Sequence, residues 1–148
     1  MSKKWGTPTW VLLHSIAEQI KENEYINNKD KLLNQLKQIC GVLPCPECKE
    51  HAQKFIAPYN INHLPTKQHF KELIWRFHNL VNQNTRKEQV GIDILSSYSK
   101  LNIGILIQVF RTEILRPIHN NQHAESMYRN RVVNNFITFL YNNRGMFN

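Results

Sequence analysis

Apolar residues recur at helical spacing along most of the chain, and no segment shows the alternation typical of a strand. A first helix is predicted to begin at the cap Thr7, with Pro8 in its first position, and to reach about Lys21. Residues 22–29 are polar and rich in Asn, so they are predicted to form a loop. A second helix is expected over residues 30–41, because Gly41 is well placed to end it.

Two further helices are predicted before the middle of the chain. One follows Pro46, which suits a first helical position, and stops near Pro58. Thr66 can cap the next helix, which extends to about Asn84. Four helices with short connections favour an up-and-down bundle.

The pattern is less regular after residue 87, but it stays helical. The expected segments are a short amphipathic piece at 92–98, a buried helix at 102–115, a polar linker at 119–123 and a last helix at 124–141. The fold class is therefore all-α, and 148 residues are enough for one domain with a buried core.

Composition narrows the class of protein. Three cysteines are an odd, low number, which argues against a secreted disulfide scaffold. No apolar signal region begins the chain and no apolar run is long enough to span a bilayer, so we expect a soluble protein of a reducing compartment. The formal net charge of +8 would suit an anionic partner. Because the basic residues are dispersed, a solvated surface is favoured over a nucleic-acid-binding stripe.

Two of the cysteines form the motif Cys45-Pro46-Glu47-Cys48. The predicted helix start places Cys45 at a helix N-terminus and Cys48 one turn inside. Free backbone N–H groups and the helix dipole stabilise a thiolate there. We therefore interpret the motif as a redox dithiol that attacks a disulfide or donates electrons to a cofactor.

Histidines and other polar or aromatic side chains border the apolar stripes of three predicted helices. Taken singly, each is best explained by packing or by a hydrogen bond at the edge of the core. Taken together, they describe a pocket beside the dithiol for a planar, hydrogen-bonding ligand, a shape that a flavin has. The residues are Trp10, His14, Cys48, His51, Trp75, His78, Asn79 and Asn82.

Three motifs carry a family resemblance. They are Trp5-Gly6-Thr7-Pro8-Thr9-Trp10-x3-His14, Leu43-Pro44-Cys45-x-x-Cys48-x-x-His51 and His78-Asn79-x-Val81-Asn82-x4-Lys87. In order and spacing the chain resembles the flavin-linked sulfhydryl oxidases of the Erv/ALR type, and most closely the branch encoded by large DNA viruses.

The resemblance implies a four-helix bundle with a short fifth helix that holds FAD, often as a homodimer. Residues 1–100 would form this oxidase domain, and residues 101–148 a helical extension packed on it. Electrons would pass from the dithiol through FAD to oxygen, giving hydrogen peroxide and disulfides in partner proteins. A viral member would work in the host cytoplasm, at the viral factory, or in the virion.

The resemblance also implies roles for single residues. Cys45 would exchange with the substrate dithiol, and Cys48 would lie over the flavin. The residues implied to bind FAD are Gly6, Thr7, Trp10, His14, Glu47, His51, His78, Asn79, Val81, Asn82 and Lys87. Cellular members carry a second disulfide where this chain has Trp75 and a residue near Ile92, so packing would replace that bridge.

Cys40 lies on an apolar face and is expected to be buried and inert. Without a shuttle cysteine pair, Cys45 would meet a partner's thiols directly, which suggests a small thioredoxin-like carrier as electron donor. Three alternatives stay open at this stage: a structural zinc site, a basic nucleic-acid-binding module and a thiol–disulfide exchanger without flavin. The zinc ligands would be Cys40, Cys45, Cys48 and His51.

Overall fold

The computed structural model describes residues 4–117 and 123–148, and these residues contain helices and loops but no β-strand. The all-α prediction is confirmed. The α-helices are α1 (Gly6–Gln19), α2 (Glu22–Cys40), α3 (Pro46–Ile56), α4 (Lys67–Asn84), α5 (Ile103–Ile114) and α6 (His123–Asn142). Short 3₁₀ segments cover Ile61–His63, Ile92–Tyr98 and Arg144–Met146.

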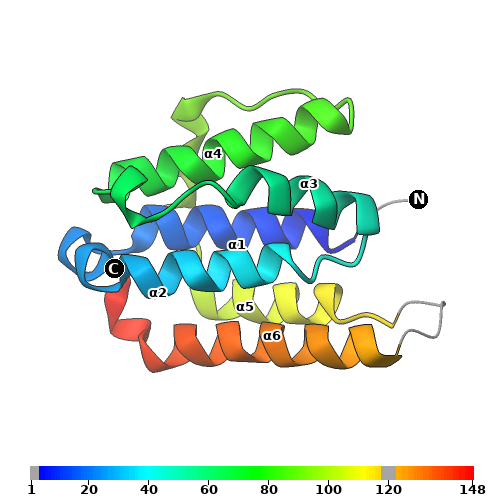
Figure 1. The fold of residues 1–148 in the computed structure, drawn as a ribbon. Helices are drawn as coiled ribbons and strands as arrows, with labels where there is room; N and C mark the ends of the chain where they lie inside the picture. Colours follow the sequence, from blue (N-terminus) through cyan, green and yellow to red (C-terminus); the bar gives the residue numbers. More distant parts are fainter. Residues whose placement is uncertain (1–3, 118–122) are drawn as a thin grey trace.

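The helices lie in three layers, with α1 and α2 in the middle (Figure 1). Helices α3 and α4 pack on one side of this pair, and α5 and α6 pack on the other. The bundle expected from α1 to α4 is therefore present, and the C-terminal helices add a layer to it. The end of the chain returns to α1, where the Asn148 N–H donates to the Gln19 carbonyl at 3.0 Å.

The predicted loop at 22–29 is wrong, because these residues form the first turns of α2. Glu22 and Glu24 lie in the first turn, where carboxylates complement the helix dipole. Tyr25 is 1% exposed, and its hydroxyl donates to the Leu64 carbonyl at 2.7 Å. One buried aromatic residue thus anchors a segment whose other residues are polar, apart from the exposed Ile26.

The predicted start of α1 is also wrong, by two residues. Trp5, not Thr7, is the N-cap, and the Thr9 hydroxyl donates to the Trp5 carbonyl at 2.6 Å. Pro8 fits the third helical position because the first N–H groups of a helix have no intrahelical acceptor. The caps predicted at Gly41 and Thr66 are confirmed.

The C-terminal predictions are confirmed in part. The short piece at Ile92–Tyr98 is a 3₁₀ segment with the expected bounds. Helix α5 was expected to be buried, but Ile105 is 62% exposed while Phe110 on another face is 1% exposed. Of the linker predicted at 119–123, His123 begins α6 and the rest lies outside the described residues.

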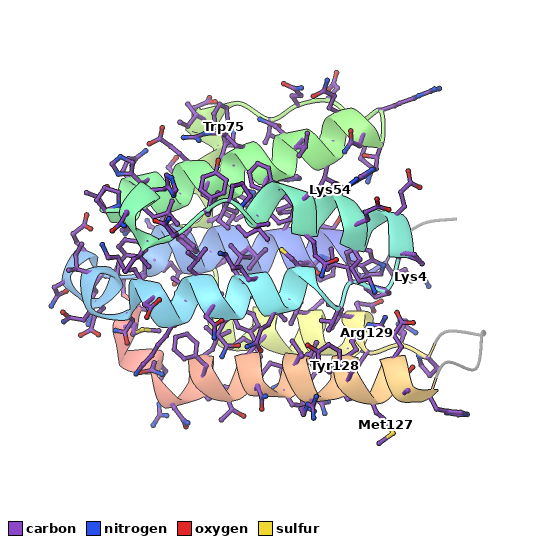
Figure 2. The ribbon with its side chains drawn as sticks, in the orientation of Figure 1. Lys4, Lys54, Trp75, Met127, Tyr128 and Arg129 are labelled. Atoms are coloured by element: carbon purple, nitrogen blue, oxygen red, sulfur yellow. The ribbon has the colours of Figure 1, made fainter. Side chains whose placement is uncertain are left out.

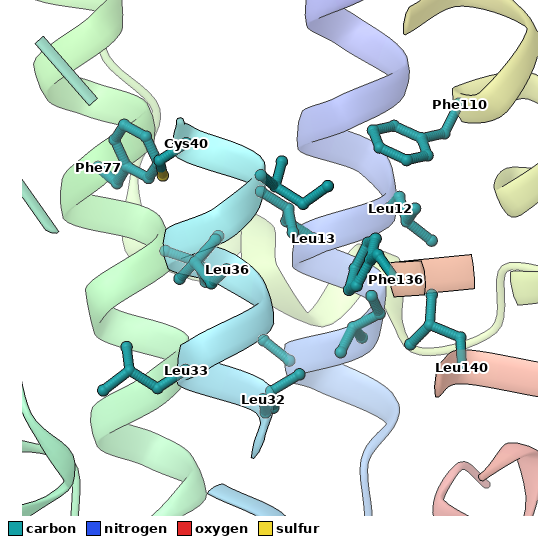
Figure 3. Close-up of a cluster of buried hydrophobic side chains, with 14 of the residues drawn as sticks. Leu12, Leu13, Leu32, Leu33, Leu36, Cys40, Phe77, Phe110, Phe136 and Leu140 are labelled. Carbon is teal, nitrogen blue, oxygen red and sulfur yellow. The ribbon is translucent and has the colours of Figure 1, made fainter. Parts of the chain in front are cut away.

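A single core runs through all three layers. Figure 3 shows Leu12 on the side of α1 that faces Phe110 and Phe136, whereas Leu13 leaves α1 on the side of α2. Helix α1 is therefore buried on two faces. In residues 4–117 and 123–148, no helix combines the length and apolar character that crossing a bilayer demands.

Candidate active site

The dithiol motif adopts the predicted arrangement at the start of α3. Cys45 is the N-cap and Pro46 the first helical residue. The Cys48 N–H donates to Cys45 Sγ at 3.2 Å, and both cysteines are partly exposed. A backbone donor and the positive end of the helix dipole both favour a thiolate at Cys45 over a thiol.

A cavity of about 370 Å³ lies beside the motif, among α1, α2, α3 and α4. Aromatic and aliphatic groups cover most of its wall, and nearly half of its lining residues carry polar or charged side chains, a mixture that suits a cofactor. Cys48 belongs to the wall, and Cys45 does not. The two residues of the motif therefore differ in their relation to the cavity, although they are only three positions apart.

The structure brings most of the predicted cofactor-binding residues to this cavity. They come from α1, from the first turns of α3, from the second half of α4 and from the turn after α4. Those that line it are Gly6, Thr7, Trp10, Glu47, His51, His78, Val81, Asn82 and Lys87.

Two predicted residues stand behind the wall instead of lining it. His14 is 2% exposed, and its Nε2 lies 2.9 Å from Nδ1 of His78. The Asn79 amide donates to the Val90 carbonyl at 2.9 Å and accepts from the Val90 N–H at 2.7 Å. His14 therefore holds His78 of the cavity wall, and Asn79 holds the loop after α4, which carries Lys87.

The imidazoles of the site are held by ring stacking. The Trp10 ring stacks on His78 with centroids 4.4 Å apart, and Tyr98 stacks on His14 at 4.8 Å. Burial, with a smaller contribution from His78, lowers the pKa of His14 to about 3. Burial and the charge of Lys87 lower the pKa of His78 to about 4. Both rings are therefore neutral at pH 7.

Several wall residues were not predicted as site residues from the sequence. Those from α2 continue its apolar stripe, so nothing in the pattern distinguishes a cavity wall from the core. Predicting Asn84 as a site residue would have required the register between α3 and α4, because its amide lies 3.5 Å from Nδ1 of His51. The unpredicted residues are Trp5, Thr9, Leu13, Leu36, Ile39, Cys40, Leu43, Ala52, Phe77, Asn84, Thr85 and Glu88.

Cys40 forms part of the cavity wall but is 1% exposed. Burial raises the pKa of its thiol to about 12, so the reactive thiolate is scarce at neutral pH. The prediction of a buried cysteine is confirmed. Within the described part of the chain, no three His, Cys, Asp or Glu side chains are grouped to hold a metal ion, so the zinc hypothesis gains no support.

The chain is similar in sequence to a known protein family. The model of the Erv1 / Alr family matches residues 7–100, which include the dithiol and every predicted cofactor-binding residue except Gly6. The chain is 27% identical over 90 residues to the putative FAD-linked sulfhydryl oxidase 096R of Invertebrate iridescent virus 3, an alignment that covers 60% of this chain and 61% of the relative.

A second relative is the probable FAD-linked sulfhydryl oxidase FPV093 of Fowlpox virus (strain NVSL). It is 33% identical over 57 residues, or 38% of this chain and 55% of the relative. The chain thus aligns with less than two thirds of the length of these relatives, and both are viral. Since the family match spans more than half of the chain and contains its dithiol and most of its cavity wall, this protein belongs to the Erv1/Alr family.

Proposed function

We propose that this protein is a FAD-dependent thiol oxidase that forms disulfides in partner proteins. The observation that carries the proposal is the position of Cys48 on the wall of an aromatic cavity, with Cys45 outside that wall. The names of both viral relatives, FAD-linked sulfhydryl oxidases, support it. A nucleic-acid-binding module would require neither the dithiol nor the cavity, and a zinc site would use the two cysteines but would leave the cavity unexplained.

The residues present suit a flavin. Trp10 and His78 form a stacked pair that offers a flat face to a planar ring. Asn82 supplies donor and acceptor atoms, and Lys87 supplies a positive charge that suits a phosphate. FAD bound there would supply a two-electron carrier between the dithiol and oxygen.

The roles of the two cysteines follow from their positions. With Cys45 and Cys48 joined as a disulfide, a client thiolate would attack Cys45, which is not part of the cavity wall, and the Cys48 thiolate would leave. The second client thiol would then displace Cys45, which yields the client disulfide and the reduced Cys45–Cys48 pair. Cys48 belongs to the cavity wall and would face FAD bound there. Overall, two client thiols lose two protons and two electrons and become a disulfide, and one oxygen molecule gains them and becomes hydrogen peroxide.

The client is proposed to be a thiol protein such as a small thioredoxin-like carrier. Cys40 is buried with a raised pKa, so it does not suit a relay, and Cys45 would meet the carrier directly. A homodimer and a place in the host cytoplasm or the virion are proposed from the family resemblance and the viral relatives.

The test is the visible absorption spectrum of the purified protein, before and after dithiothreitol is added in air. We expect a bound-flavin spectrum that bleaches while oxygen is consumed. A colourless protein that cannot be reconstituted with FAD would contradict the proposal.

Substitutions separate the two sulfur atoms. Cys45→Ser should keep the flavin and lose turnover by at least about a hundredfold, because the exchanging thiol is gone. Cys48→Ser should also lose turnover and any charge-transfer band. Cys40→Ala removes the third thiol from the cavity wall, and turnover per bound flavin should be retained because no relay runs through Cys40. If both serine variants oxidised dithiothreitol at the parent rate, the assigned roles would be wrong.

A further inference from the structure

Arg129 of α6 is the one Lys, Arg, Asp or Glu residue that is buried among residues 4–117 and 123–148, at 3% exposure. In Figure 2 its side chain lies between α6 and the layer of α1 and α2, whereas Met127 points away from the protein. Helix α6 lies beyond the family match, which ends at residue 100.

The guanidinium of Arg129 makes two hydrogen bonds. Its Nε donates to the Val42 carbonyl at 2.6 Å, and its Nη2 donates to Glu125 Oε1 at 3.0 Å. A buried charge is costly unless it is paired and hydrogen-bonded, so these bonds restrict where α6 can sit. Val42 directly follows Gly41, the C-cap of α2, where the helix dipole favours a cation.

Val42 belongs to the α2–α3 loop, residues 41–45, which leads from the end of α2 to the dithiol. Val42 and Leu43 are 3% and 7% exposed, and Leu43 lines the cavity. Pro44 has a fixed φ, which limits the backbone conformations available between Leu43 and Cys45. A shift of the Val42 carbonyl would therefore move both Leu43 and the N-cap Cys45.

We propose that Arg129 is a positioning residue for the dithiol: it holds the α2–α3 loop from the C-terminal layer and so fixes Cys45 relative to Cys48. This assigns a role to helix α6, which the matched family region does not contain. The catalytic meaning of the role rests on the proposed oxidase function, but the positioning itself does not.

The experiment compares Arg129→Met with Arg131→Met in flavin-free protein. Arg131 lies two residues further along α6 and is exposed, with its Cζ 5.2 Å from the centroid of the Tyr128 ring. Its substitution therefore controls for the loss of one positive charge from this helix. Amide hydrogen exchange of residues 42–48 is measured in the reduced protein. We expect exchange there to rise about tenfold or more in Arg129→Met, with α4 unchanged, and no rise in Arg131→Met.

A second measurement is the equilibrium of the Cys45–Cys48 pair with glutathione. A loosened loop lowers the effective concentration of one thiol at the other, so disulfide formation should become roughly threefold to tenfold less favourable in Arg129→Met. Neither measurement needs flavin or oxygen, so failure of the oxidase proposal would leave both results interpretable.

Two outcomes would overturn the proposal. One is a folded Arg129→Met protein that matches Arg131→Met in both measurements. The other is an equal rise of exchange in α4, which would report general destabilisation. If Arg129→Met does not fold, Arg129→Lys takes its place, because it keeps the charge but not the forked pair of donors. Amide exchange at residues 42–48 must then rise in Arg129→Lys, by less than the tenfold expected for Arg129→Met. Unchanged exchange there would also overturn the proposal.

Discussion

At the scale of single residues, the His14–His78 pair supplies two neutral imidazoles, His78 in the cavity wall and His14 behind it. The two rings share one hydrogen bond of 2.9 Å, and Nδ1 of the buried His14 has no hydrogen-bond partner among the described residues. An unpaired buried N–H is rarer in proteins than an unpaired acceptor. We therefore infer that His14 carries its proton on Nε2 and donates it to His78.

This pair predicts how stability depends on pH. Both folded-state pKa values, about 3 for His14 and about 4 for His78, lie below the ordinary value of 6.5. Below pH 6.5 the unfolded chain therefore binds more protons than the folded one, and the free energy of unfolding falls as the pH approaches 4. The loss is absent above pH 6.5, where both states hold neutral imidazoles.

The comparison with His14→Phe isolates this effect, since phenylalanine keeps a ring against Tyr98 but cannot be protonated. Between pH 7.5 and 4.5 the parent should lose on the order of 2 kcal/mol more unfolding free energy than the variant. Urea denaturation at several pH values measures it. Parallel curves for the two proteins would show that His14 is not the group responsible.

At the scale of the elements, the sequence predicted what local chemistry determines. The N-cap role of Cys45 and the helix after Pro46 depend on neighbouring residues, and both are present. The start of α2 was missed because Tyr25 is held by Leu64, a contact between residues far apart in the chain. The cavity wall from α2 was missed because helix pairing decides which part of an apolar stripe meets another side chain.

The loop after α4 was another feature that the sequence left open. The family resemblance implied that packing at Trp75 takes the place of a disulfide carried by cellular members. In the structure, the Trp75 indole N–H donates to the Val90 carbonyl at 2.8 Å, and Asn79 makes both of its bonds to the same residue. These bonds tie residues 85–91, which carry Lys87, to α4.

Asn79→Ala should therefore free the loop. Losing two partly buried hydrogen bonds costs about 1–3 kcal/mol, so trypsin should cleave flavin-free protein after Arg86 or Lys87 about tenfold faster. Gln83→Ala, one turn further along α4 at an exposed position, is the matched control. Equal cleavage rates in the two variants would mean that the bonds to Val90 do not hold the loop.

At the scale of the whole molecule, the family match ends earlier in the chain than the hydrophobic core does. The match ends at residue 100, yet the buried cluster continues through α5 and α6. Phe110 and Phe136 meet edge to face with centroids 6.0 Å apart, and each is 1% exposed. The C-terminal layer thus covers a face of α1 that would otherwise be apolar surface.

A chain that ends at residue 100 should therefore not behave as an independent monomer. It would expose the Leu12 face of α1 as a large apolar patch, which soluble monomers rarely carry, so we expect self-association and weak near-ultraviolet circular dichroism.

Phe136→Ala in the full chain should weaken the contact between the C-terminal layer and α1 without removing the layer. We expect it to lower the free energy of unfolding by about 3–5 kcal/mol. Sedimentation of the shortened chain and urea denaturation of the variant measure the two effects. A shortened chain that is monomeric and unfolds cooperatively would show that α1 to α4 form a complete core. The effect of Arg129 on the α2–α3 loop would then be measured by comparing the full chain with this shortened chain.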